Sequence, residues 1–166
     1  RVNAAISATL QLVAPSGSNE LSIFGGAATI DTDLSNFAVT VNNDSVINFT
    51  RSQHLSSLAL TGNARASLAS GAHLLLRTKA LSIDGHGVFD LNDNDLLLDY
   101  SGPSELAAIQ AMISRARAGG AWTGEGLTSS AAGAINPHIT TLGVLESADY
   151  LSVYGPGATF DGDPLD

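Results

Sequence analysis

The fold is decided by residues 58–98, which read LALTGNARASLASGAHLLLRTKALSIDGHGVFDLNDNDLLL. A short apolar-x-apolar unit recurs six times in this stretch, and the starts of successive units are spaced 8, 8, 7, 8 and 7 residues apart. The units are Leu58/Leu60, Ala66/Leu68, Leu74/Leu76, Leu81/Ile83, Phe89/Leu91 and Leu96/Leu98. Such alternation is typical of strands with one buried face, and the Thr-Gly-Asn, Ser-Gly and Asp-Gly pieces between the units are typical of turns.

Regular short strands separated by small turns fit two mainly β architectures. In a short-rung β-solenoid with two strands per coil, this spacing predicts coils of about 15 residues. In a β-sandwich, the same strands would form two packed antiparallel sheets. We favour the solenoid because the spacing is even and the turns are short, and the sandwich stays open as the alternative.

Strands are also predicted upstream of this stretch. Val39/Val41 and Ile47/Phe49 extend the alternating pattern, and further strands are expected over residues 8–13, 20–24 and 27–30. The Pro- and Gly-containing residues 14–19 are typical of an exposed loop. The amino-terminal half is therefore predicted to be all β.

At about residues 104–118 the spacing of apolar residues changes from that of a strand to that of a helix. We predict one amphipathic capping helix there. Leu106, Ile109, Met112 and Ile113 recur at helical spacing, Ser104 is a candidate N-cap, and the segment ends in two glycines. A helix placed after the last coil of a solenoid would cover its apolar end and its open backbone edge.

The change from strands to a helix near residue 100 divides the chain into two parts of one domain. The β-rich repeat region is predicted over residues 1–100. Residues 101–166 supply the capping helix, a Gly/Ser/Ala-rich loop over residues 121–136 and a final strand over Tyr150–Tyr154, packed on the first part.

Because the chain opens on Arg1 and stops in a turn-like tetrapeptide, we expect a mature product or an excised fragment.

Composition excludes several classes of function. The net charge is −9, with five basic and four acidic residues in 1–82 against two basic and twelve acidic residues in 83–166. This balance argues against nucleic acid and anionic membranes as partners. The chain lacks cysteine, which excludes disulfides, thiolate metal sites and cysteine nucleophiles, and no apolar run is long enough to insert into a membrane.

The densest polar cluster is a candidate calcium site, and calcium is the only cofactor that the sequence suggests. Asp90, Asn92, Asp93 and Asp95 offer the oxygen ligands that calcium prefers. The opening D-x-N-x-N matches an EF-hand loop, but the sixth position is Asp95 instead of Gly and the twelfth is Ser101 instead of Glu. The alternative is that these residues form turns and a solvated edge, which we favour.

Carbohydrate chemistry is the second alternative for the same region. Paired carboxylates hydrolyse glycosidic bonds, and Trp122 is a candidate for stacking on a glycan. However, the aromatic residues are scattered along the sequence, the four histidines are far apart, and no G-x-S-x-G elbow occurs. No catalytic residues are therefore assigned, and we predict that the chain is not an enzyme.

Four segments resemble a region near the carboxyl terminus of large secreted or surface proteins of planctomycete-type bacteria. These segments are residues 53–58 (QHLSSL), 89–96 (FDLNDNDL), 118–124 (AGGAWTG) and 128–132 (TSSAA). Proteins of that group carry autotransporter-like β-strand repeats, often followed by a dockerin-like segment. The resemblance spans residues 42–160 and implies an extracellular or cell-surface location and a structural, repeat-bearing role. It transfers no catalytic residue, and the chain ends before any dockerin-type calcium motif.

The leading prediction is a non-enzymatic extracellular structural module, part of a surface fibre, stalk or matrix. It would self-assemble by strand-edge pairing, with Val2–Val13 as the donor strand. Expected partners are other copies of the chain or neighbouring surface-protein segments. The alternatives are a carbohydrate-binding or carbohydrate-active β-helix module, with a glycan as partner, and a calcium-stabilised adhesin domain.

Overall fold

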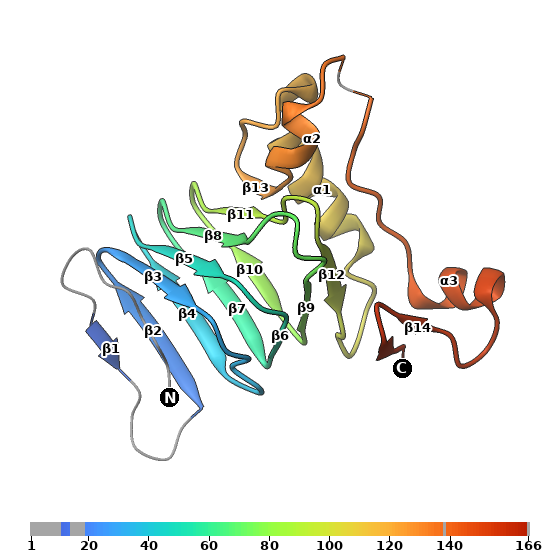
Figure 1. The fold of residues 1–166 in the computed structure, drawn as a ribbon, viewed down its shortest axis with the longest axis horizontal. Helices are drawn as coiled ribbons and strands as arrows, with labels where there is room; N and C mark the ends of the chain where they lie inside the picture. The colour runs from blue at the N-terminus through green and yellow to red at the C-terminus, as the bar shows by residue number, and fades with distance from the viewer. Residues whose placement is uncertain (1–10, 14–18, 138, 166) are drawn as a thin grey trace.

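The computed structural model describes residues 11–13, 19–137 and 139–165. Its main body is a parallel β-solenoid of about four coils, followed by helices that gather at the carboxyl-terminal end of the stack (Figure 1). The predicted fold class is confirmed, and the solenoid applies instead of the sandwich.

Three sheets run along the coil stack. In sheet order, the first contains β1 (Gln11–Val13), β2 (Glu20–Phe24), β4 (Ala38–Asn42), β7 (Ser57–Leu60) and β10 (Leu81–Ile83). The second contains β13 (Gly126–Thr128), β11 (Val88–Asp90), β8 (Arg65–Leu68), β5 (Val46–Phe49) and β3 (Ala27–Ile30). The third contains β12 (Asp95–Leu98), β9 (Leu75–Thr78) and β6 (Gln53–Leu55). All neighbours within these sheets are parallel except β1 and β2, which are antiparallel.

The coils are longer than predicted. Leu21, Val39, Leu58 and Leu81 are successive partners in the first sheet, which gives steps of 18, 19 and 23 residues. The predicted coil of about 15 residues with two strands is therefore wrong. The repeating unit of seven or eight residues was identified correctly, but three units make one complete coil in this part of the chain, because the solenoid has three sheets. The spacing of strands along the sequence does not determine how many strands make up one coil.

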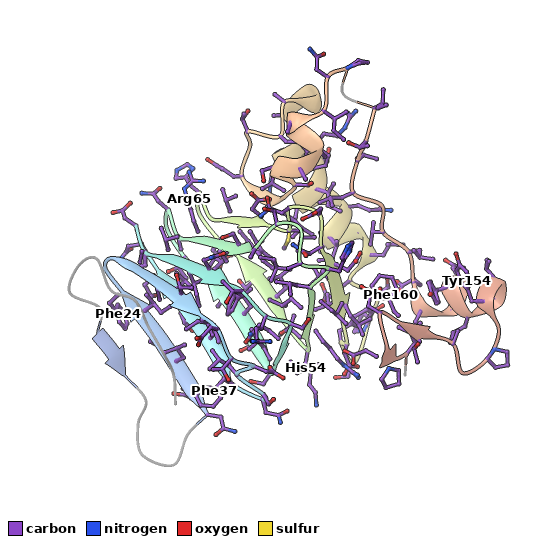
Figure 2. All side chains as sticks on the ribbon, in the orientation of Figure 1. Phe24, Phe37, His54, Arg65, Tyr154 and Phe160 are labelled. Atoms are coloured by element: carbon purple, nitrogen blue, oxygen red, sulfur yellow. The ribbon has the colours of Figure 1, made fainter. Side chains whose placement is uncertain are left out.

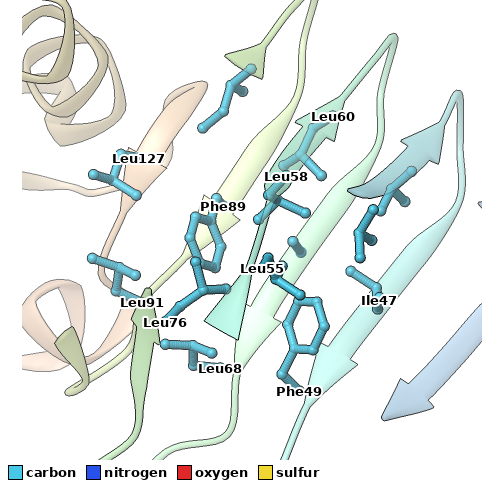
Figure 3. Close-up of a cluster of buried hydrophobic side chains, with 14 of the residues drawn as sticks. Ile47, Phe49, Leu55, Leu58, Leu60, Leu68, Leu76, Phe89, Leu91 and Leu127 are labelled. Atoms are coloured by element: carbon cyan, nitrogen blue, oxygen red, sulfur yellow. The ribbon is translucent and has the colours of Figure 1, made fainter. Parts of the chain in front are cut away.

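The core is a set of apolar columns inside the stack. Ala28, Ile47, Ala66, Phe89 and Leu127 occupy equivalent positions in the second sheet, and all are buried (Figure 3). Burying a Leu, Ile or Phe side chain stabilises a fold by about 1.5–3 kcal/mol. In β5 and β8 the alternate residues face outward, so the sequence pattern and the burial pattern coincide on these strands.

Glycine is required where turns of successive coils stack. Gly62 and Gly85 have φ of 64° and 66°, in the left-handed region. A Cβ on Gly85 would lie 3.1–3.3 Å from backbone atoms of Gly62, and one on Gly62 would lie 3.1 Å from the Cα of Asn43. The Thr-Gly-Asn and Asp-Gly-His turns thus set how closely the coils pack.

The capping helix is confirmed as α1 (Leu106–Arg117). Ile109 and Ile113 are buried in the same cluster as the solenoid core, and Arg115 and Arg117 lie in the last turn. The Ser104 hydroxyl accepts a hydrogen bond from the Leu106 N–H (3.2 Å), although the N-cap position itself is Glu105. A short 3-10 turn, η1 (Ala118–Gly120), follows the helix.

The secondary structure after residue 120 was predicted less accurately from the sequence. The segment 121–136, predicted as a loop, contains β13 and the short helix α2 (Ser130–Ala134). Tyr150–Tyr154, predicted as a strand, belongs to the helix α3 (Ser147–Tyr154), which ends at Gly155. The hairpin β14 (Thr159–Phe160) and β15 (Asp163–Pro164) follows. Aromatic and β-branched residues favour strands only where a neighbouring strand can pair with them, and no sheet of the stack includes a strand from residues 147–154 (Figure 1).

No helix in the described ranges is both long enough and apolar enough to cross a membrane.

Candidate functional site

The acidic residues proposed to hold calcium form hydrogen bonds with backbone groups in different parts of the structure. Asp90 Oδ1 accepts hydrogen bonds from the backbone N–H groups of Asn92 and Ser130, both at 2.9 Å. The two Asp93 oxygens lie 2.9 and 3.0 Å from the backbone nitrogen of Gly71. These carboxylates connect the turn before β12 to the preceding coil and to the start of α2.

The two asparagines of the same turn are also structural. Asn94 is 5% exposed, and its Oδ1 accepts from the Leu74 N–H (2.8 Å) while its Nδ2 donates to two backbone carbonyls (2.9 Å each). Asn92 has a φ of 53° and donates to the Leu68 carbonyl (2.6 Å). These contacts agree with the turn interpretation. Within residues 11–13, 19–137 and 139–165 no three His, Asp or Glu side chains form a metal-binding group, and calcium stays a prediction.

Asp95 differs from its neighbours because its carboxyl faces a second carboxyl. Partial burial, together with a hydrogen bond to Asp161 and the charge of Asp161, raises the pKa of Asp95 to about 6, against the opposing effect of His73. Asp161 lies in the turn between β14 and β15. Two residues more than 60 positions apart in the sequence thus meet through a contact that favours the protonated form of Asp95.

Trp122 is buried, with 6% of its surface exposed. Its Cβ lies 3.2 Å from the position that a Cβ on Gly133 would take, so the ring packs under α2. Its Nε1–H has no hydrogen-bond partner among the described residues. Stacking a glycan on this ring would require the packing around α2 to open.

His54 links the first coils to the end of the chain, a contact that the sequence did not indicate. Its Nδ1 lies 2.8 Å from Asp33 Oδ2, and its Nε2 lies 3.2 Å from Asp163 Oδ2. Burial raises the pKa of Asp33, but hydrogen bonds from His54 and Ser35 outweigh this effect and hold the pKa below its usual value. The hairpin β14–β15 is thereby tied to β6.

The C-terminal arm, defined here as residues 143–165, packs against the third sheet and the start of α1 and leaves a cavity of about 310 Å³. Leu96, Leu98 and Ile109 supply apolar walls, and Arg77, Asp99, Glu105 and Glu146 supply charged groups. Mixed cavities of this size, with a few convergent polar groups, are the ordinary form of a small-molecule site. It is the candidate functional site of this chain.

The charged groups of this cavity are held in place by one another and by hydroxyls. Arg77 Nη2 donates to Asp99 Oδ2 at 2.9 Å. Glu146 accepts hydrogen bonds from the hydroxyls of Ser104 and Tyr100, the latter at 2.7 Å, and these two bonds lower the pKa of Glu146. The carboxylate is therefore ionised at neutral pH, and it fixes the arm to the segment before α1.

Three aromatic side chains that are close in the sequence gather on the arm. The ring centroids of Tyr150 and Tyr154 are 4.5 Å apart with an interplanar angle of 32°, and Phe160 meets Tyr150 edge-on at 5.6 Å and 80°. Figure 2 shows Tyr154 and Phe160 at the opposite end of the molecule from Phe24. The only sequence signal was the i, i+4 spacing of the two tyrosines, which brings them together if the segment is helical.

No family model, curated protein or solved structure matches this chain.

Proposed function

We propose that this chain is a non-enzymatic structural module of an extracellular or cell-surface protein, used in a fibre, stalk or matrix, and that it associates through one end of its coil stack. The observation that carries the proposal is the difference between the two ends of the second sheet. The engagement of the most polar turn, Asp90–Asp95, in hydrogen bonds between coils also supports a structural role.

The carboxyl-terminal end of the second sheet is covered. β13 adds a further strand to β11, and α1 packs on β13 so closely that a Cβ on Gly126 would lie 2.6 Å from the Met112 carbonyl oxygen. Only glycine fits there. A helix lying on the last strand prevents another chain from pairing with it.

The amino-terminal end presents a strand edge. In the described part of the chain β3 pairs only with β5, and Val46 N and Thr50 N donate to the carbonyls of Gly26 and Ile30. In a parallel ladder alternate residues bond to the same neighbour, so the N–H and C=O groups of Thr29 point away from β5. An unpaired edge of this kind is a template for another strand.

A second copy of the chain is the simplest occupant of this edge. Two β3 strands can pair antiparallel around a two-fold axis, which makes a closed, self-complementary contact. The predicted donor segment, Val2–Val13, lies largely outside the described residues. Its described part, Gln11–Val13, pairs with β2 of the same chain, so donation to another copy would compete with this pairing.

Two substitutions at Thr29 test the proposal. Thr29→Pro removes the outward N–H without removing a bond to β5, while Thr29→Val keeps the N–H in a side chain of similar shape. Sedimentation velocity over a range of concentrations and electron microscopy, each with and without calcium, should show association for the parent and Thr29→Val chains and monomers for Thr29→Pro. A parent chain that stays monomeric throughout, or a Thr29→Pro chain that associates normally, contradicts the proposal.

A further inference from the structure

The charged side chains that line the cavity under the C-terminal arm are mostly acidic. The carboxylates of Asp99, Glu105 and Glu146 line it, against the single guanidinium of Arg77. Glu105 is exposed, and its side chain forms no hydrogen bond or ion pair with the described residues. A ligand that satisfies these acceptors must bring donors of its own, either hydroxyl or ammonium groups.

One wall of the cavity is an aromatic ring held from two sides. Tyr150 lines the cavity, Tyr154 stacks on it at 4.5 Å without lining the cavity, and Phe160 meets its edge at 5.6 Å. The Tyr150 hydroxyl donates to the Thr159 carbonyl (3.2 Å), which fixes the ring further. A fixed ring beside carboxylates suits a ligand with one apolar face and a hydroxyl-rich edge.

We propose that this cavity binds one sugar residue, neutral or carrying an amino group. The apolar face of the sugar ring packs on Tyr150, and its hydroxyl or amino donors reach Glu105, Asp99 and Glu146. This activity is additional to the structural role and does not depend on association through β3.

Charge and size narrow the class of sugar. Three carboxylates and one guanidinium leave the lining negative, so a uronic acid is repelled and an amino sugar is attracted. The cavity of about 310 Å³ is at the lower end of the range for small-molecule sites, a size that suits a single sugar ring.

Three probes with the same ring separate these contributions: glucosamine, glucose and glucuronate. Nuclear magnetic resonance titration of the full chain should give dissociation constants in the millimolar range, smallest for glucosamine and largest for glucuronate. The shifted amides should lie in β12, in the start of α1 and in the arm. Added salt should reduce the advantage of glucosamine over glucose, because the contact with partly exposed carboxylates is screened.

Matched substitutions identify the residues responsible. Tyr150→Leu should weaken glucose binding about fivefold or more, while Phe24→Leu, at an exposed ring on β2 that does not line the cavity, should leave it within about twofold. Glu105→Gln should remove most of the preference for glucosamine. Glu125→Gln is its control, because Glu125 lies beside His86, does not line this cavity and carries the same charge.

The proposal is overturned if none of the three sugars shifts the cavity amides, or if glucuronate binds as well as glucosamine. It is also overturned if the control substitutions weaken binding as much as the cavity substitutions. Should Tyr150→Leu displace the arm, Glu105→Gln still decides the outcome, because the Glu105 side chain forms no hydrogen bond or ion pair with another described residue.

Discussion

The coil stack and the C-terminal arm are held by different forces. In the stack, strands pair in register with the next coil and the inward side chains are fully buried, as for Phe49 and Phe89. In the arm, α3 has no buried residue, and polar contacts such as His54 with Asp163 and Asp95 with Asp161 fix the hairpin. The stack is therefore stabilised by apolar burial, which is insensitive to pH, whereas the docking of the arm depends on groups that titrate.

The largest contrast is expected between two aromatic truncations. Phe89→Ala removes a ring that is 0% exposed between two neighbouring strands, and we expect the free energy of unfolding to fall by about 3–5 kcal/mol. Tyr154→Ala removes a ring that is 66% exposed on α3, and we expect a loss of less than about 1 kcal/mol. Urea denaturation followed by circular dichroism measures both. Equal losses would mean that the arm belongs to the cooperative core.

A glycine pair tests how closely the coils stack. Gly85 and Gly71 have similar φ of 66° and 71°, but a Cβ on Gly85 would press on Gly62 backbone atoms while one on Gly71 would meet nothing within 4 Å. We expect Gly71→Ala to cost about 1 kcal/mol from the left-handed conformation alone. Gly85→Ala should cost about 1–3 kcal/mol more, because the coils must separate. Thermal unfolding compares the two, and equal costs would show that the turn stacking is loose.

The pH dependence of the arm should come from Asp95. The folded chain keeps a proton on this group up to about pH 6, whereas the ordinary pKa is 3.8, so between these values the folded state binds more protons than the unfolded state. The free energy of unfolding should therefore fall as the pH rises through this window. Because Asp95 is exposed, solvent screening should make the change smaller than for a buried group.

Asp95→Asn is the direct test of this window. The amide remains neutral and can donate to the Asp161 carboxylate, so the variant should be at least as stable as the parent at neutral pH and should lose the decline in stability above pH 4. Asp149→Asn, on the exposed face of α3, should keep the parental decline. Urea midpoints at several pH values give both curves, and an unchanged decline in Asp95→Asn would assign the dependence to a group other than Asp95.

The sequence was sufficient where the structure repeats and insufficient where it does not. The bounds of β2 and β3 match the predicted ranges, and α1 lies within the predicted helix, because alternation and helical spacing report local burial. The arm has no repeating pattern, and its contacts join residues as distant as His54 and Asp163. The prediction of coil length was wrong for a related reason. The number of strands in a coil depends on how the three sheets are arranged, and the pattern of a single strand does not report it.

The smallest expected effect distinguishes the two interpretations of the acidic turn. Asp93 accepts from the Gly71 backbone nitrogen with both oxygens, so Asp93→Ala should destabilise the stack by about 1 kcal/mol through the loss of that contact. If the carboxylate acts only in this turn, the loss is the same in calcium and in chelator. A ligand that binds only the folded state raises its stability, so a bound calcium ion would make the loss larger in calcium than in chelator. Thermal unfolding of the parent and variant chains under both conditions separates a hydrogen-bonded turn from a calcium-stabilised one, and the observed contacts lead us to expect equal losses.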